Sequence, residues 1–231
     1  FRVGALPGVQ ENEPNGEFAK PQEVPLDVTV SGVVAGEDVD YYAFRATKGQ
    51  RVTAEVEAIR LGRTVFDAYV AILNSARFEL ASCDDSALLR QDPVASAVIP
   101  EDGTYVVEVR EASYGGSDQC LYRLHLGTFP RPLAVVPAGG KAGQEVEVAF
   151  LGDAAGEIRE KVRLPEAPTP AYALFSGDGT GTAPSPNAFR VSAFENVLEA
   201  EPNDSREQAT GGAAAPCALN GILSRPGGED R

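Results

Sequence analysis

Residues 51–58 read Arg-Val-Thr-Ala-Glu-Val-Glu-Ala and alternate without a break between polar and apolar side chains. Successive side chains of an extended chain point to opposite sides. The valines and alanines therefore share one face, while Thr53, Glu55 and Glu57 share the other. This segment predicts a β-strand that buries one face and turns a polar face outward.

The same alternation recurs elsewhere, in residues 26–30, 105–109, 122–126 and 146–150. Turn signals separate these runs, at Lys48-Gly49, Asp102-Gly103, Gly115-Gly116 and Ala138-Gly139-Gly140. No window of helical length carries a clean apolar stripe of helical period. Short strands with one polar face are typical of antiparallel sheets that pack face to face. The predicted fold class is all-β, beginning with an antiparallel, jelly-roll-like β-sandwich.

The composition of the 231-residue chain excludes several classes of function. It holds 34 acidic and 20 basic residues, for a formal net charge of −14, with no Trp, no Met and one His. Nucleic-acid binders carry a basic footprint, so no nucleic-acid partner is predicted. No apolar run reaches the roughly 18 residues of a membrane-spanning helix, so no transmembrane segment is predicted. The opening Phe1-Arg2-Val3-Gly4 resembles neither a translation start nor a secretory signal, which we interpret as a piece of a longer polypeptide.

The cysteines bear on the compartment in which the protein works. Cys83 and Cys120 each lie beside a predicted strand, and we predict a disulfide between them. Such a bond would place the protein outside the cytoplasm. The alternative is a pair of buried free thiols in a cytosolic protein. Cys217 would pair outside this sequence, stay free or link two chains, and the absence of CxxC pairs argues against structural zinc.

A short motif occurs twice and divides the chain. Residues 11–16 read Glu-Asn-Glu-Pro-Asn-Gly, and residues 199–204 read Glu-Ala-Glu-Pro-Asn-Asp, so a structural unit restarts late in the chain. The predicted parts are an entry segment (1–10), a β-sandwich (11–127), a small immunoglobulin-like β-domain (128–196) and the truncated start of a second sandwich (197–231). The last part is too short to bury a core of its own. Its open sheet edge predicts self-association.

Acidic residues are spaced so that their side chains converge. Glu11 and Glu13 are two apart on an extended chain and aim their carboxylates to one side, with Asn15 in line. Asp38 and Asp40 form a second pair of this kind. Gathering such carboxylates without a counter-ion costs roughly 1 kcal/mol per close pair even in water. Calcium accepts about six to eight oxygen ligands, so Ca²⁺ is the predicted cofactor. The alternative is that these are solvated charges on an acidic surface.

Several motifs in one order carry a family resemblance. They are Glu11-x-Glu13-Pro14-Asn15, residues 36–44 and 48–52, Asp84-Asp85, Asp102-Gly103-Thr104-Tyr105 and Tyr122-Arg123-Leu124. Together they resemble the bacterial pre-peptidase C-terminal (PPC) domain, a β-sandwich similar to the collagen-binding module of bacterial collagenases. The segment 128–196, with Val135-Val136-Pro137 and Val146-Glu147-Val148, resembles an immunoglobulin-like module of the IPT/TIG type.

The resemblance implies a function and a set of calcium ligands. The implied ligands are Glu11, Glu13, Asn15, Asp38 and Asp40, with Glu37 as the alternative to Asp38. A second, incomplete set comprises Glu199, Glu201, Asn203, Asp204 and Asp230. The implied function is that of a non-catalytic, calcium-stabilised accessory or binding module of a larger bacterial protein, often a peptidase. Its setting would be extracellular, on the cell surface, or in the periplasm and cell envelope. Its partners would be a protein, a matrix or cell-envelope polymer, or other domains of the same polypeptide.

The search for catalytic residues gives none. His125 is the single imidazole, and its neighbours Leu124 and Leu126 face the core, so we expect His125 to point outward. No nucleophile elbow, zinc-protease helix or phosphate-binding loop is present. Asp178-Gly179-Thr180 is best interpreted as a turn. We predict that the chain is not an enzyme.

Two functional hypotheses remain open from the sequence. If the accessory module binds a partner through a sheet face, the candidate contact residues are Tyr41, Tyr69 and Tyr114. The alternative is a structural tandem-repeat segment of a cell-envelope, stalk or filament protein with no soluble substrate. The recurring Glu-x-Glu-Pro-Asn motif favours that alternative, because an appended targeting module has no need to repeat.

Overall fold

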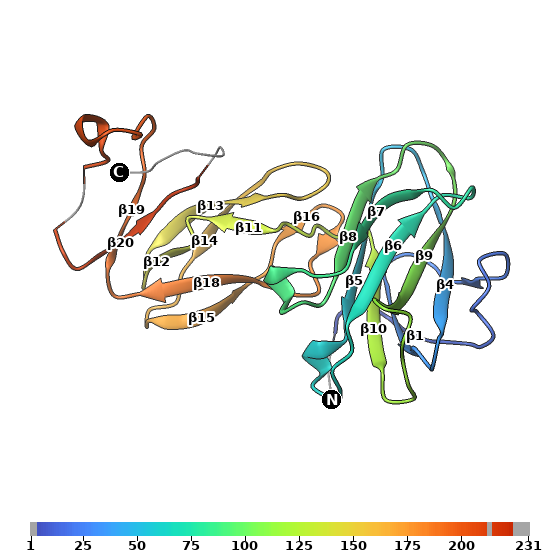
Figure 1. Cartoon of the computed structure of the whole chain (residues 1–231). Coiled ribbons are helices and arrows are strands. Elements are labelled where there is room, and N and C mark those ends of the chain that lie inside the picture. The colour runs from blue at the N-terminus through green and yellow to red at the C-terminus, as the bar shows by residue number, and fades with distance from the viewer. Residues whose placement is uncertain (1–3, 212–213, 224–231) are drawn as a thin grey trace. The chain divides into compact units, whose positions relative to one another are not determined.

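The computed structural model describes residues 4–211 and 214–223, and it consists largely of β-strands (Figure 1). The all-β prediction is confirmed. Among the described residues the helices are single 3₁₀ turns, and not one has the length or hydropathy of a transmembrane segment. The turns are η1 (Ile59–Leu61), η2 (Ala87–Leu89) and η3 (Arg206–Gln208).

The chain forms two compact units. Unit 1 contains the residues up to Arg131 together with two later segments, 153–155 and 177–185. Unit 2 contains residues 132–152 and 156–176 and those that follow Ser185. This division places residues 128–131 with the sandwich and places the region after residue 197 in the same unit as the middle segment.

Unit 1 is a sandwich of two five-stranded sheets. The first sheet has the order β1 (Gly8–Gln10), β3 (Val28–Val33), β10 (Leu121–Gly127), β5 (Arg51–Glu57) and β8 (Val94–Val98). The second has the order β2 (Gln22–Glu23), β4 (Val39–Ala46), β9 (Gly103–Glu111), β6 (Ala68–Leu73) and β7 (Glu79–Cys83). The pairs β1–β3 and β2–β4 are parallel, and the other pairs are antiparallel.

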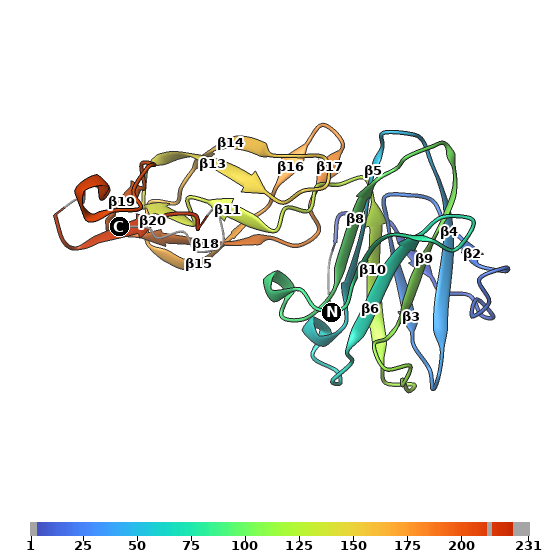
Figure 2. The same ribbon diagram turned by 45° about the horizontal axis from the view of Figure 1, so that its top comes forward.

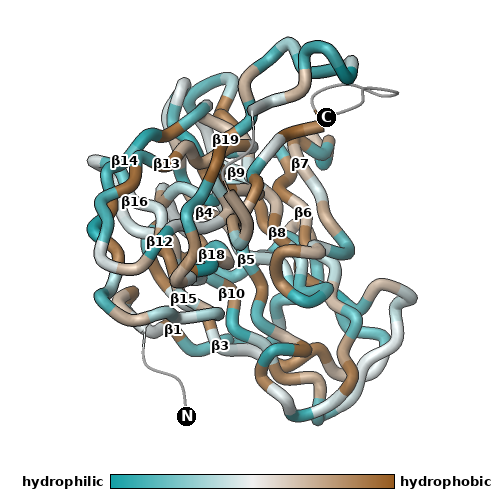
Figure 3. The backbone as a smooth tube through the Cα atoms, turned by 90° about the vertical axis from the view of Figure 1, so that its left-hand side faces the viewer, coloured by the Kyte–Doolittle hydropathy of each residue, from teal (hydrophilic) through white to brown (hydrophobic). Residues whose placement is uncertain are grey.

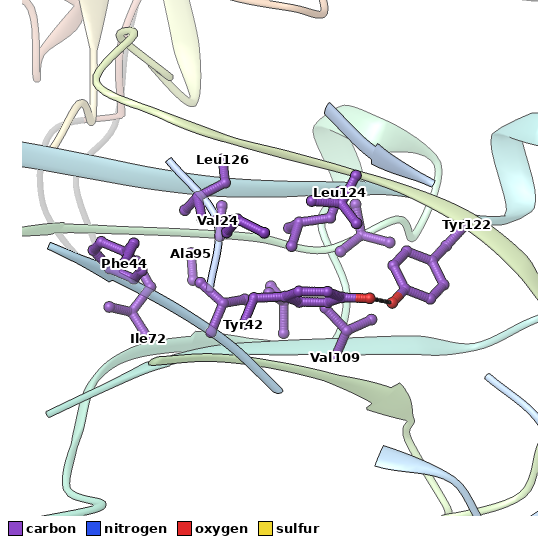
Figure 4. Packing of buried hydrophobic residues seen from close by; sticks show 14 of the residues in the cluster. Val24, Tyr42, Phe44, Ile72, Ala95, Val109, Tyr122, Leu124 and Leu126 are labelled. Carbon is purple, nitrogen blue, oxygen red and sulfur yellow. Dashed lines mark hydrogen bonds between the residues drawn. The ribbon is translucent and has the colours of Figure 1, made fainter. Parts of the chain in front are cut away.

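The predicted apolar face of β5 lies in the core of this sandwich. Val52, Ala54 and Val56 are fully buried there. Burying one valine side chain contributes about 1.5–3 kcal/mol, so this strand anchors the first sheet to the second. Figure 4 shows Tyr42 and Tyr122 within the same cluster, with their hydroxyl groups pointing at each other. In Figure 3 hydrophobic residues lie along the strands of each unit.

The predicted polar face of β5 is buried as well, which corrects the expectation of a solvent-facing side. Glu55 is 0% exposed, and the Thr53 hydroxyl donates to the Phe129 carbonyl over 3.1 Å. The segments 128–131 and 177–185, both part of unit 1, cover this face. Because they lie far from β5 in the sequence, the local alternation could not show them.

The expectation that His125 points outward is wrong for the same reason. His125 is buried, at 4% exposure, on the covered face of β10. Its Nδ1 lies 2.8 Å from the Thr29 hydroxyl, and its Nε2 lies 3.5 Å from Glu57 Oε2. Both ring nitrogens therefore face polar groups of the protein.

The predicted disulfide between Cys83 and Cys120 is not formed, and both are free thiols. Cys83 ends β7, an edge strand of the second sheet, whereas Cys120 precedes β10, an inner strand of the first sheet. The Cys120 Sγ lies 3.4 Å from the Ser117 hydroxyl. The sandwich therefore does not bring the two sulfurs together, and the inference of an oxidising compartment loses this support.

These two thiols give a direct test of the sandwich. We expect Cys83 and Cys120 to be alkylated in denaturant without prior reduction, because neither is in a disulfide. In the folded protein, burial raises the pKa of the Cys83 thiol, and Cys120 is buried, so both should react slowly before denaturation. Peptide mass mapping with and without reductant measures this. A linked Cys83–Cys120 peptide in the unreduced digest would contradict the structure.

Unit 2 contains two three-stranded sheets around a small core. One has the order β11 (Ala134–Val136), β13 (Glu145–Leu151) and β14 (Ile158–Arg163); the other has β12 (Gly139–Lys141), β18 (Asn187–Ser192) and β15 (Thr169–Leu174). Phe150 and Phe189 lie in this core at 2% exposure or less. A separate parallel pair, β19 (Glu195–Leu198) and β20 (Cys217–Asn220), also belongs to unit 2.

The Asp178-Gly179-Thr180 sequence forms a turn, as predicted. It connects β16 (Gly177–Asp178) to β17 (Gly181–Thr182), a short hairpin of unit 1 that is labelled in Figure 2. The Thr180 amide donates to Asp178 Oδ1 over 2.8 Å. Asp178 Oδ2 also forms an ion pair of 2.7 Å with Arg51, so the hairpin is fixed to β5.

Candidate metal centre

The segment 11–15 is held to both sheets of unit 1. Directly after β1, the Glu11 amide donates to the Ser31 carbonyl on β3 over 3.0 Å. At the other end of the segment, the Tyr41 amide on β4 donates to the Asn15 carbonyl over 3.2 Å. The acidic motif therefore lies against the ends of two strands that come from opposite sheets.

Three carboxylates meet at this place. Glu11, Glu13 and Asp40 each offer an oxygen within 4.8 Å of the other two. Asp40 is 0% exposed, Glu11 is half-buried and Glu13 is exposed, so the group extends from the protein interior to the surface. Asp40 points inward because it lies two residues before the buried Tyr42 on β4, and such residues share a face.

Two tyrosines and a glycine position the Glu11 carboxylate. Its Oε1 accepts hydrogen bonds from Tyr42 (2.8 Å) and Tyr122 (3.0 Å), and its Oε2 accepts one from the Val33 amide (3.0 Å). A Cβ at Gly32 would lie 2.6 Å from Glu11 Oε1 and 2.5 Å from the Tyr122 hydroxyl. Gly32 therefore leaves the space in which this carboxylate and this hydroxyl meet.

Buried polar atoms in this group lack hydrogen-bond partners within the described part of the chain. Asn15 is 1% exposed, yet neither its Oδ1 nor its Nδ2 is bonded, and Asp40 Oδ1 is likewise unpaired. An unsatisfied buried polar atom costs about 1–3 kcal/mol. A hard cation bound by the oxygens would remove part of this cost, and carboxylate and amide oxygens are the ligands that Ca²⁺ takes. The residues present therefore fit calcium.

The electrostatics of Asp40 agree with that fit. Burial, and then the neighbouring charge of Glu11, raise the pKa of Asp40 to about 9. Its Oδ2 accepts a hydrogen bond of 2.7 Å from the Tyr122 hydroxyl, which acts in the opposite direction but is too weak to offset them. Burial, and then the neighbouring Tyr42, Asp40 and Glu11, raise the pKa of Tyr122, so this hydroxyl keeps its proton and remains a donor.

Asp38, one of the predicted ligands, lies outside the group of three carboxylates. Its Oδ1 accepts the Val39 amide over 2.9 Å, and its Oδ2 accepts the Ala35 amide over 3.4 Å, so it caps its own loop. Glu37, the alternative to Asp38, is exposed and has a φ of +60°. The backbone N–H of Asn15 donates to Glu13 Oε2 over 2.9 Å, which links Asn15 to the group.

The second predicted set repeats the local geometry of the first without completing it. The backbone N–H of Asn203 donates to Glu201 Oε2 over 3.0 Å. The Asn203 side chain is 1% exposed, and its Oδ1 has no hydrogen-bond partner in the described residues. The Ile222 amide donates to Glu199, as the Val33 amide does to Glu11. Asp204 is exposed, and Asp230 lies outside the described residues. Across residues 4–211 and 214–223, the one group of three acidic, His or Cys ligands is that of Glu11, Glu13 and Asp40.

The tyrosines proposed as a binding surface differ in their positions. Tyr41 is buried at 4% exposure, so the expectation of an exposed ring is wrong there. It packs edge-on against Phe18, with ring centroids 5.7 Å apart. Tyr69 is half-buried and Tyr114 is 56% exposed. The Arg110 guanidinium carbon lies 3.8 Å from the centroid of the Tyr69 ring and 4.2 Å from that of Tyr114.

An ionic network on β5 was missed from the sequence. Arg131 and Glu55, both fully buried, form an ion pair of 2.6 Å. Glu55 also pairs with Arg60 over 3.0 Å and accepts a hydrogen bond from the Ser185 hydroxyl. The sequence identified Glu55 as a polar position of the strand, but its partners lie in loops that have no periodic hydrophobic pattern. The Tyr42 and Tyr122 hydroxyls were missed as well, although both residues belong to the motifs that carry the family resemblance.

Unit 1 is thus a β-sandwich module whose distinguishing feature is an acidic oxygen site at its entry segment. Residues 38–111 match the model of the family described as the bacterial pre-peptidase C-terminal domain. This confirms the family resemblance for the first unit.

Solved structures with similarity to the chain come from several bacteria. The pre-peptidase C-terminal domain of a collagenase from Bacillus anthracis is 16% identical, with 50% of this chain and 99% of that one covered, at a TM-score of 0.36. PliG of Aeromonas hydrophila, a periplasmic inhibitor of g-type lysozyme, is 16% identical, with coverage of 46% and 95% and a TM-score of 0.36. PliG of Salmonella Typhimurium is 18% identical, with coverage of 46% and 97% and a TM-score of 0.30. No curated protein matches the sequence, and the comparisons indicate no catalytic family.

Proposed function

We propose that unit 1 is a non-catalytic, calcium-stabilised accessory module of a larger bacterial protein that works outside the cytoplasm. The observation that carries this proposal is the convergence of Glu11, Glu13 and Asp40 beside the buried side chain of Asn15, which has no hydrogen-bond partner among the described residues. The family match over residues 38–111 supports the accessory role, because the family is described by its place in pre-peptidases.

The residues of the site would act on the structure and not on a substrate. Glu11 and Glu13 belong to the entry segment, whereas Asp40 belongs to β4 of the second sheet. When bound, calcium supplies the positive charge that lets these carboxylates stay ionised together. The bound carboxylates would tie the entry segment to the sandwich and limit the motion of whatever precedes the module.

The proposed partners are other domains of the same polypeptide and an extracellular protein or polymer. An exposed aromatic ring supplies contact area at low entropic cost. Tyr114, stacked on Arg110 at 4.2 Å, is the exposed ring that supports a contact of this kind. Deleting the Tyr114 ring should leave the fold intact because the ring is largely outside the core.

Thermal unfolding in EDTA, then in graded calcium with magnesium as the comparison, tests the calcium site. We expect a calcium-specific rise in stability of about 2.7 kcal/mol when calcium is near 100 times its Kd. Glu13→Gln should reduce the rise, because it removes an exposed carboxylate of the group. Glu17→Gln is the matched control, since Glu17 is exposed, near in sequence and paired only with Lys20 in the described residues. Equal shifts with magnesium and calcium, or no shift at all, would contradict the proposal.

A structural tandem-repeat segment is the second candidate function. It is favoured by the repeated geometry at Glu199, Glu201 and Asn203, which an appended single module would not need. The sequence of the parent gene separates the two candidates. A catalytic domain in the same polypeptide favours the accessory module, and further copies of the Glu-x-Glu-Pro-Asn unit alone favour the tandem repeat.

A further inference from the structure

The hairpin between β6 and β7 carries an exposed phenylalanine. Phe78 directly precedes β7 and is 70% exposed. The Asn74 side chain holds the turn, because its Oδ1 accepts the backbone N–H of Ala76 over 3.0 Å and that of Phe78 over 2.9 Å. Arg77 has a φ of +65°, which is uncommon for a residue other than glycine. The turn that carries Phe78 is therefore fixed in advance, and little conformational entropy is lost when a partner covers the ring.

Arg77 holds this hairpin over the outer face of the second sheet. Tyr41 belongs to that face, because its neighbour Tyr42 points into the core between the sheets. The Arg77 guanidinium donates to the Tyr41 hydroxyl over 2.8 Å. Its central carbon also lies 5.4 Å from the ring centroid of Phe18 and 5.7 Å from that of Tyr41, within the range of a cation–π contact.

The same outer face contains a groove. Ala43 follows Tyr41 by two residues on β4 and therefore shares its face. Together with the segment that follows β2, it lines a groove of about 420 Å³. Five of the eight lining residues are apolar, and Val24 and Ala43 among them are 6% exposed. Glu23 and Arg45 are exposed residues of the same lining, so the groove has an apolar floor and charged groups at its rim.

The hairpin and the groove lie at the same end of the second sheet. Strand β6 ends with Leu73 opposite Val106, so the hairpin extends toward the start of β9. Strand β4 places Arg45 opposite Thr104, which is also at the start of β9. Phe78 does not line the groove of its own chain. Two copies that meet by these faces can each place a ring in the groove of the other, which is the self-complementary contact of a two-fold dimer.

The charges beside Phe78 are complementary to those of the groove. Arg77 precedes Phe78 and Glu79 follows it. The rim of the groove carries Glu23 and Arg45, one of each sign. Exposed ion pairs add little affinity, but complementary charges select the partner and its orientation. A phenyl ring flanked by an arginine and a glutamate therefore fits this groove, and the chain's own hairpin has that arrangement.

We propose that unit 1 binds a second copy of this chain, with Phe78 of each copy in the groove of the other. Arg77 then faces Glu23, and Glu79 faces Arg45. Aromatic side chains that fill pockets supply a large share of the affinity of protein interfaces, so Phe78 is the anchor of this contact. This inference does not depend on calcium binding.

Sedimentation velocity of the whole chain over a series of concentrations, in EDTA, measures the association. We expect a monomer–dimer equilibrium. Phe78→Ser should raise the Kd about 100-fold or more, because both contacts of the dimer lose their ring and each loss costs about ten-fold. Val65→Ser is the matched control and should associate as the unchanged chain does, because Val65 is 89% exposed and does not line the groove.

A mixing experiment tests the pairing of hairpin and groove. Arg45→Glu should also weaken association, because it places a like charge opposite Glu79. The Phe78→Ser chain keeps its groove, and the Arg45→Glu chain keeps its Phe78. A mixture of the two retains one intact contact for each dimer, so it should associate about ten-fold more tightly than either variant alone.

Three outcomes would overturn the proposal. The first is a monomeric mass of the unchanged chain at all concentrations. The second is a dimer that Phe78→Ser leaves unchanged, since the copies would then meet elsewhere. The third is a mixture that associates no more tightly than its two components. Circular dichroism confirms that each variant is folded, which is expected because Phe78, Val65 and Arg45 are all exposed.

Discussion

Glu55→Gln is expected to lower the free energy of unfolding by about 3–5 kcal/mol, because it removes one partner of a buried ion pair. Glu55 and Arg131 are 0% and 1% exposed, and the ion pair between them is 2.6 Å long. Both terminal nitrogens of Arg131 lack hydrogen-bond partners within the described residues. Burial lowers the pKa of Arg131, and the charge of Glu55 is the main influence that keeps it protonated. Without that carboxylate the guanidinium is a buried charge with no nearby counter-charge.

Denaturant unfolding of the single and double variants measures this effect. Replacing the pair together, as Glu55→Leu with Arg131→Met, should restore much of the lost stability, because two apolar side chains do not need each other's charge. Glu147→Gln is the control, since Glu147 and Arg159 form an ion pair of 3.5 Å with both side chains more than half exposed. Exposed pairs of this kind contribute about 0–1 kcal/mol. A loss for Glu55→Gln no larger than that of the control would contradict a buried, charged network on β5.

The same network shows where prediction from the sequence stops. The alternation in residues 51–58 predicted the strand and its apolar face correctly, because that pattern depends only on neighbouring residues. It could not predict what covers the polar face. Arg131 and Ser185 reach Glu55 from loops far along the chain, and neither loop has a periodic pattern. His125 was misplaced for the same reason.

The sequence predicted only part of the acidic site, because residue spacing does not determine loop conformation. Glu11, Glu13 and Asn15 are close in the chain, so their spacing alone predicted that they lie together. Asp38 and Asp40 have the same spacing, but only Asp40 joins the group, because Asp38 turns its carboxylate to amides of its own loop. The direction of the Asp38 carboxylate depends on the conformation of its loop, which the residue spacing does not determine. The disulfide prediction failed because it required knowing that β7 is an edge strand of one sheet whereas β10 is the middle strand of the other.

Asp40→Asn is expected to change stability in opposite directions with and without calcium. In EDTA it should raise the free energy of unfolding by at least about 1 kcal/mol, because a buried carboxylate beside Glu11 is replaced by a neutral group of the same shape. The substituted side chain can keep its amide oxygen toward the Tyr122 hydroxyl, which lies 2.7 Å from Asp40 Oδ2 in the unchanged chain. Burial and the charge of Glu11 raise the pKa of Asp40, which is the cost that the substitution removes.

In calcium the same substitution should abolish most of the gain of about 2.7 kcal/mol expected near 100 times Kd. A neutral amide oxygen is a weaker ligand for Ca²⁺ than a carboxylate, and the affinity of such sites depends on the charge of their ligands. Calorimetry of the unchanged chain, Asp40→Asn and the control Glu17→Gln, each in EDTA and in calcium, measures both directions. If Asp40→Asn lost stability equally in both conditions, Asp40 would be a structural residue of β4 and not a ligand. If it kept the full calcium response, the ion would bind elsewhere, since Asp40 is the one deeply buried carboxylate of the group.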